Sequence, residues 1–414
     1  MFKALFVWFP ICLMLAGCTE ENSQPGAKTF DFPNPVNTYG RPIDTQKKQT
    51  YKTEGGLFAD NQFPGARLNK FLQVNDTLFK ATISPENSPI NRSPWYAFRI
   101  WSDQEQEVYI RLSYGPFRHR YAPKISSNSN DWQQIDAGLI TYDSDSSNAT
   151  IKLSVSQDTL WIAAQPIEDS KRVKDWCEKL SLDPKVHFDI IGKSTDHRDL
   201  YRLDMYKGER KNKDLVVLMG RQHPPEVTGY LAMKAFVENL VTSEIADQFF
   251  DRYRVLIFPL LNPDGVDRGH WRHNAHGVDL NRDWAKYRQQ EVKQIADHIV
   301  HESTTFNNRV VLGLDFHSTY KDVFYTNHVE TMKSVIPGFR EVWFRGFEAA
   351  LGNGYRVNER PSKVGSPVSK AWFYLQFQAE GITYEIGDNT PRDFITRKGK
   401  VTSEEMMKAL LQVN

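Results

Sequence analysis

After about residue 170 the sequence alternates short apolar runs with longer stretches of helical periodicity, and this alternation constrains the fold more than any other feature. Apolar runs of five to seven residues have the length of buried strands, and apolar side chains spaced three and four apart indicate helices. Strands alternating with helices are typical of an α/β domain, which we expect over residues 172–414. The expected strands are Leu215–Met219, Val255–Leu260, Val310–Phe316 and Ile382–Ile386, and the expected helices are Thr228–Leu240, Gln289–His301 and Thr402–Leu411.

Residues 51–168 show a different pattern of residue types. Short runs rich in aromatic and β-branched residues mostly alternate apolar with polar side chains, and Gly, Asn, Ser and Pro separate them. This pattern predicts an all-β sandwich domain ahead of the α/β domain. The clearest expected strands are Trp95–Trp101, Glu107–Leu112, Thr150–Val155 and Thr159–Ala163.

Residues 1–17 have the form of a signal peptide. Lys3 precedes an uncharged run over residues 4–16 that is too short to span a bilayer as a mature helix. The sequence LAGC ending at Cys18 resembles a bacterial lipobox, so we expect a lipid anchor on Cys18; the alternative is an ordinary secretory signal with an incidental cysteine. Thr19 favours the periplasmic face of the outer membrane within the bacterial cell envelope. Residues 18–50, polar and rich in Pro and Gly, predict a flexible tether.

Composition excludes two classes of protein. The 52 Lys and Arg residues balance 51 Asp and Glu residues, and no long block carries one sign, so nothing indicates a nucleic-acid binder. Of the three cysteines, Cys177 alone lies beyond Cys18, so the folded part is not a disulfide scaffold.

The stretch HPPE, from His223 to Glu226, follows the first expected buried strand of the α/β domain. A residue before proline avoids helical backbone, and Pro225 suits the first turn of a helix, so both side chains are held between a strand and a helix. Ligands of α/β sheets bind at that edge. Taken alone, the stretch is either half of a metal site or a stiff turn.

Further motifs follow HPPE along the chain: NPDGV from Asn262, GHWR from Gly269, GVDLNRDW from Gly277, DFHS from Asp315 and TYE from Thr383. In this order they resemble the motifs of the zinc carboxypeptidases, and most closely those of the cytosolic-carboxypeptidase-like branch of that family. The resemblance favours the metal site over the stiff turn for HPPE. It also implies a mixed-sheet zinc carboxypeptidase domain preceded by an all-β sandwich.

The resemblance implies one zinc ion per chain, held by His223, Glu226 and His317. Three nitrogen and oxygen ligands with an open fourth position are typical of a catalytic zinc site. The resemblance also implies that Glu385 is the general acid/base. The apolar strand around this carboxylate is expected to raise its pKa. Arg272 matches the arginine that stabilises the developing oxyanion.

Three more residues match substrate-binding or supporting positions of the family. Asn281 and Arg282 correspond to the pair that binds the terminal carboxylate of a substrate. Asp279 corresponds to the carboxylate that orients the first histidine ligand.

The sequence departs from digestive members of the family. Their capping tyrosine lies 22 residues before the catalytic glutamate, where this chain has Lys363 in a segment that resembles the Lys-x-Gly-Ser/Thr stretch of the cytosolic-type branch. Lys370 stands at the position of the residue that selects the substrate side chain, so it predicts a preference for acidic C-terminal residues. It is equally interpreted as a solvated surface lysine.

Two groups of residues near Arg272 invite a metal or a binding role. We expect His270, His273 and His276 to face solvent or the rim of the substrate site rather than a second metal. Trp271 and Trp284 are expected to be packing residues.

The predicted function is zinc-dependent removal of C-terminal residues from peptides. An alternative of the same chemistry is a murein-peptide carboxypeptidase or amidase, which an envelope location would suit, and an aspartoacylase-like deacylase shares the ligand pattern but fits the Asn281-Arg282 pair less well. An alternative of another class is an inactive, tethered binding protein. The complete set of predicted ligands and catalytic residues argues against it.

Overall fold

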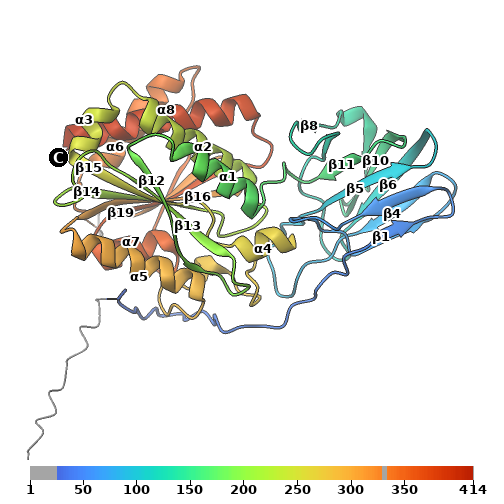
Figure 1. The fold of residues 1–414 in the computed structure, drawn as a ribbon, viewed down its shortest axis with the longest axis horizontal. Helices are drawn as coiled ribbons and strands as arrows, with labels where there is room; N and C mark the ends of the chain where they lie inside the picture. The colour runs from blue at the N-terminus through green and yellow to red at the C-terminus, as the bar shows by residue number, and fades with distance from the viewer. Residues whose placement is uncertain (1–25, 329–332, 414) are drawn as a thin grey trace, which may run out of the picture.

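The computed structural model describes residues 26–328 and 333–413 (Figure 1). The predicted signal peptide and Cys18 lie outside the described residues. A mixed eight-stranded sheet organises the chain from residue 186 onward, with parallel pairing at its centre between β14, β15, β16 and β19. Its strands run in the order β12 (Val186–Lys193), β13 (Asp199–Met205), β15 (Tyr253–Phe258), β14 (Asp214–Gly220), β16 (Val310–Thr319), β19 (Glu380–Gly387), β17 (Val323–Asn327) and β18 (Glu359–Ser362).

Helices cover both faces of this sheet (Figure 1). Alternate residues of β14 enter different cores: Val216 and Leu218 join the core under α2 and α8, whereas Leu215 and Val217 join the core under α5 and α7. Burial on both faces explains why the sequence shows continuous apolar runs there. The helices are α1 (Ser170–Leu180), α2 (Val227–Thr242), α3 (Ala246–Arg252), α4 (Pro263–Arg268), α5 (Gln290–Thr305), α6 (Phe339–Leu351), α7 (Ser369–Phe377) and α8 (Arg392–Val413).

Two further sheets form what we call the β unit, residues 50–163, and they share one hydrophobic core. The boundaries 51–168 of a separate sandwich domain stay a prediction. The larger sheet runs in the order β1 (Thr50–Lys52), β2 (Leu57–Asp60), β5 (Ala97–Ser102), β11 (Leu160–Ala163), β7 (Lys124–Ser126) and β8 (Gln133–Gln134). The smaller runs in the order β3 (Lys70–Gln73), β4 (Leu78–Thr82), β6 (Gln106–Ser113), β10 (Asn148–Val155) and β9 (Ile140–Tyr142).

The predicted flexible tether is wrong for residues 26–49, which we call the strap. The strap has no regular secondary structure, yet it lies along the α/β part of the chain (Figure 1). The backbone N–H of Phe30 donates to the carbonyl of Ala285 at 3.2 Å, and the Thr38 hydroxyl donates to Asp283 at 2.5 Å. Phe30 also packs against the core below the sheet. These contacts satisfy polar groups and bury apolar surface, which a solvated tether would not do.

Within the described ranges, no helix combines the length and the apolar character that a membrane span requires.

Candidate active site

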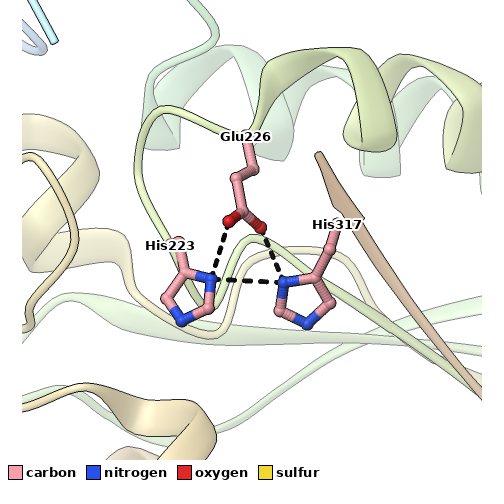
Figure 2. A group of neighbouring side chains, drawn as sticks. All are labelled: His223, Glu226 and His317. Atoms are coloured by element: carbon pink, nitrogen blue, oxygen red, sulfur yellow. Dashed lines mark hydrogen bonds and ion pairs between the residues drawn. The ribbon is translucent and has the colours of Figure 1, made fainter. Parts of the chain in front are cut away.

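Three predicted metal ligands meet at the carboxyl ends of two neighbouring parallel strands. His223 and Glu226 lie on the connection from β14 to α2, and Glu226 directly precedes the helix. His317 lies near the end of β16, which pairs with β14 in register up to Gly220 and Phe316. The two imidazole rings and the carboxylate therefore point toward one another from two elements that the sheet holds together (Figure 2).

The donor atoms of the three side chains lie close enough together for one metal ion to bind all of them. Glu226 lies 2.9 Å from Nδ1 of His223 and 2.6 Å from Nδ1 of His317, and the two Nδ1 atoms are 3.2 Å apart (Figure 2). Two nitrogens bound tetrahedrally to zinc lie about 3.3–3.4 Å apart. All three side chains are buried. Two imidazole nitrogens and one carboxylate form a donor set of catalytic zinc sites, so the residues present fit this metal.

Carboxylates behind the rings fix the histidines. Nε2 of His223 lies 2.9 Å from Asp279, and Nε2 of His317 lies 2.8 Å from Asp315. Each carboxylate can accept the Nε2 proton, which leaves Nδ1 unprotonated for a metal. Asp315 was not among the residues expected at the site from the sequence. Its position two residues before His317, on the same face of a strand, was the available signal.

Glu385 lies on β19 in register with His317 on the neighbouring parallel strand. Burial raises its pKa to about 8, and the nearby charge of Glu226 acts in the same direction, while His317 and Arg272 oppose the shift. Its buried Oε2 atom has no hydrogen-bond partner among the described residues. The carboxyl group is therefore free to exchange a proton with a reactant.

Arg272 and His223 share one carboxylate. Asp279 accepts from Nε of Arg272 at 2.8 Å and lies 2.7 Å from its Nη2, while its other oxygen contacts His223. Burial alone would raise the pKa of Asp279, but Arg272 and His223 outweigh it and hold that pKa well below the ordinary range. Asp279 thus stays charged, and it links the orientation of the Arg272 side chain to that of the His223 ring.

The predicted carboxylate-binding pair lies on a short 3₁₀ turn, η2 (Leu280–Arg282). The side chain of Asn281 is fixed because its Oδ1 accepts the backbone N–H of Ser369, and its Nδ2 lies 3.4 Å from Nε2 of His317. Arg282 donates to the carbonyl of Asn281 at 2.7 Å, and its side chain is 36% exposed. Arg282 can therefore reach a ligand at the mouth of the site.

Lys370 is not a solvated surface lysine. Its residue is 6% exposed, and Nζ donates to the carbonyl of Thr326, to Asn327 and to the hydroxyl of Ser362, at 2.9–3.2 Å. Burial lowers its pKa to about 8. The lysine head is thus a buried cation in the wall of the site, held by neutral oxygen atoms.

One cleft of about 350 Å³ unites these residues and adds several that the sequence did not indicate. The ligands, Glu385, Arg272, Asn281, Arg282 and Lys370 all line it. Tyr325 of β17 lines it as well, whereas Lys363, at the counted position of the capping tyrosine, is not among the lining residues. The β unit contributes Asn91, Ser93 and Arg120. No motif marked these three, because they reach the cleft only through tertiary packing.

Two of the three histidines around Arg272 are not at a solvent-facing rim, so that expectation was wrong for them. His270 is 2% exposed and His273 5% exposed; Nδ1 of His270 contacts the carbonyl of His273, and His273 contacts Asn87 of the β unit at 2.6 Å. These contacts make them structural. Trp271 and Trp284 are fully buried, as expected for packing residues.

Comparisons with known proteins agree with this geometry. The sequence model of a family described as zinc carboxypeptidase matches residues 173–401. Over 346 residues the chain is 24% identical to cytosolic carboxypeptidase 6 of Caenorhabditis elegans, a match that covers 74% of this chain and 73% of the relative. An uncharacterised protein of Zymomonas mobilis is 25% identical over 57% of this chain, and the match spans 62% of that relative's length.

The fold also matches a solved structure. A metallo-carboxypeptidase from Burkholderia cenocepacia superposes with a TM-score of 0.71 at 18% identity, and the match covers 86% of this chain and 100% of that chain. At this identity the likeness concerns the fold. The superposed region must extend beyond the α/β sheet and its helices, because these alone make up less than 86% of the chain.

Proposed function

The chain belongs to the zinc carboxypeptidase family, and from this membership we propose that it hydrolyses the last peptide bond of peptide substrates. The observation that carries the proposal is the convergence of His223, Glu226 and His317 beside the unpartnered carboxyl oxygen of Glu385. A divalent metal site next to a free carboxyl group is suited to hydrolysis by an activated water.

His223, Glu226 and His317 would hold one zinc ion. When bound, zinc polarises a substrate carbonyl and lowers the pKa of a coordinated water toward about 7. Glu385 accepts the proton of the attacking water and donates it to the leaving amine, and its raised pKa suits both transfers. Arg272 places a permanent positive charge beside the carbonyl oxygen as negative charge develops there.

Asn281 and Arg282 would bind the terminal carboxylate of the peptide. The guanidinium can donate two parallel hydrogen bonds to a carboxylate, which sets the direction in which the chain enters. Both residues line the same cleft as the ligands. Their removal should raise KM more than it lowers kcat, since the carboxylate is bound in the ground state as well as in the transition state.

The first prediction tests the activity itself. Zinc-loaded protein incubated with a mixture of peptides of defined C-terminus should release single C-terminal residues, measured by mass spectrometry. Glu385→Gln should lower kcat by roughly 10²–10⁴-fold, because it removes general acid/base catalysis and keeps the shape of the side chain. Metal content measured on both proteins should be equal. Intact peptides after incubation with zinc-loaded wild-type protein would refute the proposal.

We further propose a preference for acidic C-terminal residues. Lys370 supports it, because all three hydrogen bonds that this buried cation donates in the cleft wall go to neutral oxygens, and the charge of Glu380 acts on it without a hydrogen bond. A substrate carboxylate could replace the Ser362 hydroxyl as acceptor and gain a charge-assisted hydrogen bond.

The second prediction follows from that preference. Lys370→Met keeps the apolar stem and removes the charge, so the ratio of Glu to Leu release, as kcat/KM, should fall by about tenfold or more, equivalent to 1.4 kcal/mol. Lys363→Met, outside the cleft lining, is the matched control and should leave the ratio unchanged. An unchanged ratio in Lys370→Met would rule out this role.

A lipid anchor on Cys18, and with it a place at the periplasmic face of the outer membrane, is also proposed. The basis is the LAGC sequence after an apolar run. Labelling of the wild-type protein by a fatty acid in a bacterial host, absent from Cys18→Ser, is the expected result. Equal labelling of both would contradict it.

A further inference from the structure

The backbone on either side of Arg272 is held by a carboxylate from outside the α/β part of the chain. Glu86 of the β unit accepts three consecutive backbone N–H groups, from Trp271 at 2.7 Å, Arg272 at 3.0 Å and His273 at 2.7 Å. Glu86 and Arg272 are 186 positions apart in the sequence. Three donors on one carboxylate form the kind of anion nest that fixes a loop backbone tightly.

Glu86 is built into the interior. The residue is fully buried, and its environment supplies compensating charge from the guanidinium of Arg67. Burial raises the pKa of Glu86, but His270, the His273 backbone N–H and Arg67 outweigh it, so the net shift is downward. Burying the charged Glu86 carboxylate without such partners would cost free energy. Glu86 therefore needs the backbone N–H groups of residues 271–273, and the carboxylate in turn holds that backbone in place.

The loop itself, Gly269–Gly277, is shaped to fit the β unit, and we call it the arginine loop. Gly269 and Gly277 both have positive φ, at 68° and 69°. A Cβ atom on Gly269 would lie 2.4 Å from the carbonyl oxygen of Ala66, and one on Gly277 would lie 2.4 Å from Nδ2 of Asn87. Both ends of the loop therefore approach the β unit too closely for any other residue.

The middle of the arginine loop is anchored in the β-unit core. The indole of Trp271 is fully buried there and meets Phe117 edge to face, with ring centroids 5.1 Å apart. Helix α4, which leads into the loop, faces the β unit (Figure 1). Trp271 and Glu86 thus fix the residues before and around Arg272, and the side chain of Arg272 extends from this anchored backbone to Asp279 and the cleft.

We propose that Glu86 is a positioning residue for Arg272, so that this residue of the β unit takes part in transition-state stabilisation although it does not itself line the substrate cleft. The inference rests on the proposed function, in which Arg272 stabilises the oxyanion. A misplaced catalytic group loses rate even when its chemistry is intact, and small displacements are enough. Glu86 therefore acts on kcat through the backbone of the arginine loop.

The test uses the full-length, zinc-loaded protein. Glu86→Gln keeps the size of the side chain but presents an amide N–H to backbone donors, so at least one of the three contacts is lost. We expect kcat to fall roughly 10- to 100-fold with little change in KM. The matched control is Asp60→Asn, a buried, ion-paired carboxylate of the same unit that is bonded to Arg99 rather than to the loop. It should leave kcat unchanged.

A double-mutant cycle separates positioning from general destabilisation. If Glu86 acts through Arg272, Glu86→Gln should cost little further rate in an Arg272→Ala background. Additive losses, or a wild-type kcat in Glu86→Gln, would overturn the inference. Should Glu86→Gln not fold, Asn87→Ala, which frees the His273 ring and the Gly277 carbonyl, tests the same loop with the same cycle.

The cycle also distinguishes the two levels of proposal. If the wild-type protein releases no C-terminal residues, or if Arg272→Ala retains full kcat, the proposed function or its oxyanion step fails. If both behave as proposed but Glu86→Gln does not, the failure belongs to the positioning role alone.

Discussion

At the scale of single residues, Asp279 connects the two halves of the chemistry. One of its oxygens contacts His223, the proposed zinc ligand, and the other accepts from Arg272. In the proposed mechanism, zinc binding by His223 and the orientation of Arg272 therefore depend on the same carboxylate. Loss of its charge should disturb both at once, whereas Asp315 contacts His317, Gln222 and Ser369, so its loss should leave the contacts of Arg272 in place.

The third prediction concerns this shared carboxylate. Asp279→Asn should weaken zinc binding and lower kcat/KM, each by roughly 10–100-fold, because outer carboxylates orient ligand histidines and raise their basicity. Competition with a chromogenic chelator measures the affinity, and peptide kinetics measure the rate. Asp204→Asn, which removes a buried carboxylate paired with Arg254 away from the cleft, is the control. Zinc affinity equal to wild type in Asp279→Asn would contradict the role.

At the scale of elements, the strap supports the turn that carries the predicted carboxylate-binding pair. The Thr38 hydroxyl donates to Asp283, the residue that ends η2. The backbone carbonyl of Thr38 accepts from the side chain of Gln289 at 2.7 Å. Asp283 in turn accepts the backbone N–H of Gln289. The strap thus completes the hydrogen bonding of the segment directly after Arg282.

The fourth prediction tests that support. Thr38→Val keeps the side-chain shape and removes the hydroxyl donor to Asp283, so the free energy of unfolding should fall by about 1.5–3 kcal/mol, as for hydrogen bonds to charged groups. Urea unfolding measures the change. Thr45→Val alters an exposed strap residue and should be nearly neutral. An equal, small effect of both substitutions would show that the strap lies on the surface without stabilising it.

At the scale of the whole molecule, lowering the pH should destabilise the fold, because the folded protein keeps three buried histidines neutral. Burial lowers the pKa of each to about 4, below the ordinary 6.5, so between these values the unfolded chain binds more protons than the folded one. Their contribution to stability is complete above about pH 6.5 and is lost as the pH falls toward 4. The histidines are His119, His273 and His298.

The fifth prediction is the resulting slope. From pH 6.5 to 4.5 the free energy of unfolding should fall, by at most about 1.4 kcal/mol per pH unit for each histidine. His119→Gln, which can still pair with the hydroxyl of Tyr114, should reduce the slope measured by urea unfolding at successive pH values. Parallel curves for the variant and the wild type would exclude His119 as a contributor.

The sequence predicted those parts of the site that lie in ordered local motifs, because strand ends and helix starts place their side chains predictably. His223, Glu226, His317 and Glu385 meet as expected from strands that the apolar runs identified. Glu86 was not predictable in this way. It lies in an irregular polar segment with no periodicity, and its role exists only because two regions far apart in the sequence pack together.

The strap limits how far the α/β part can lie from a lipid anchor on Cys18. Among the described residues, the first hydrogen bond to the α/β part is made by Ala27, nine residues after Cys18, and nine fully extended residues span at most about 32 Å from an acylated Cys18. A free chain to residue 50 would allow about three and a half times that reach. An enzyme anchored in this way would work close to the lipid surface, on peptides that come within a few nanometres of the bilayer.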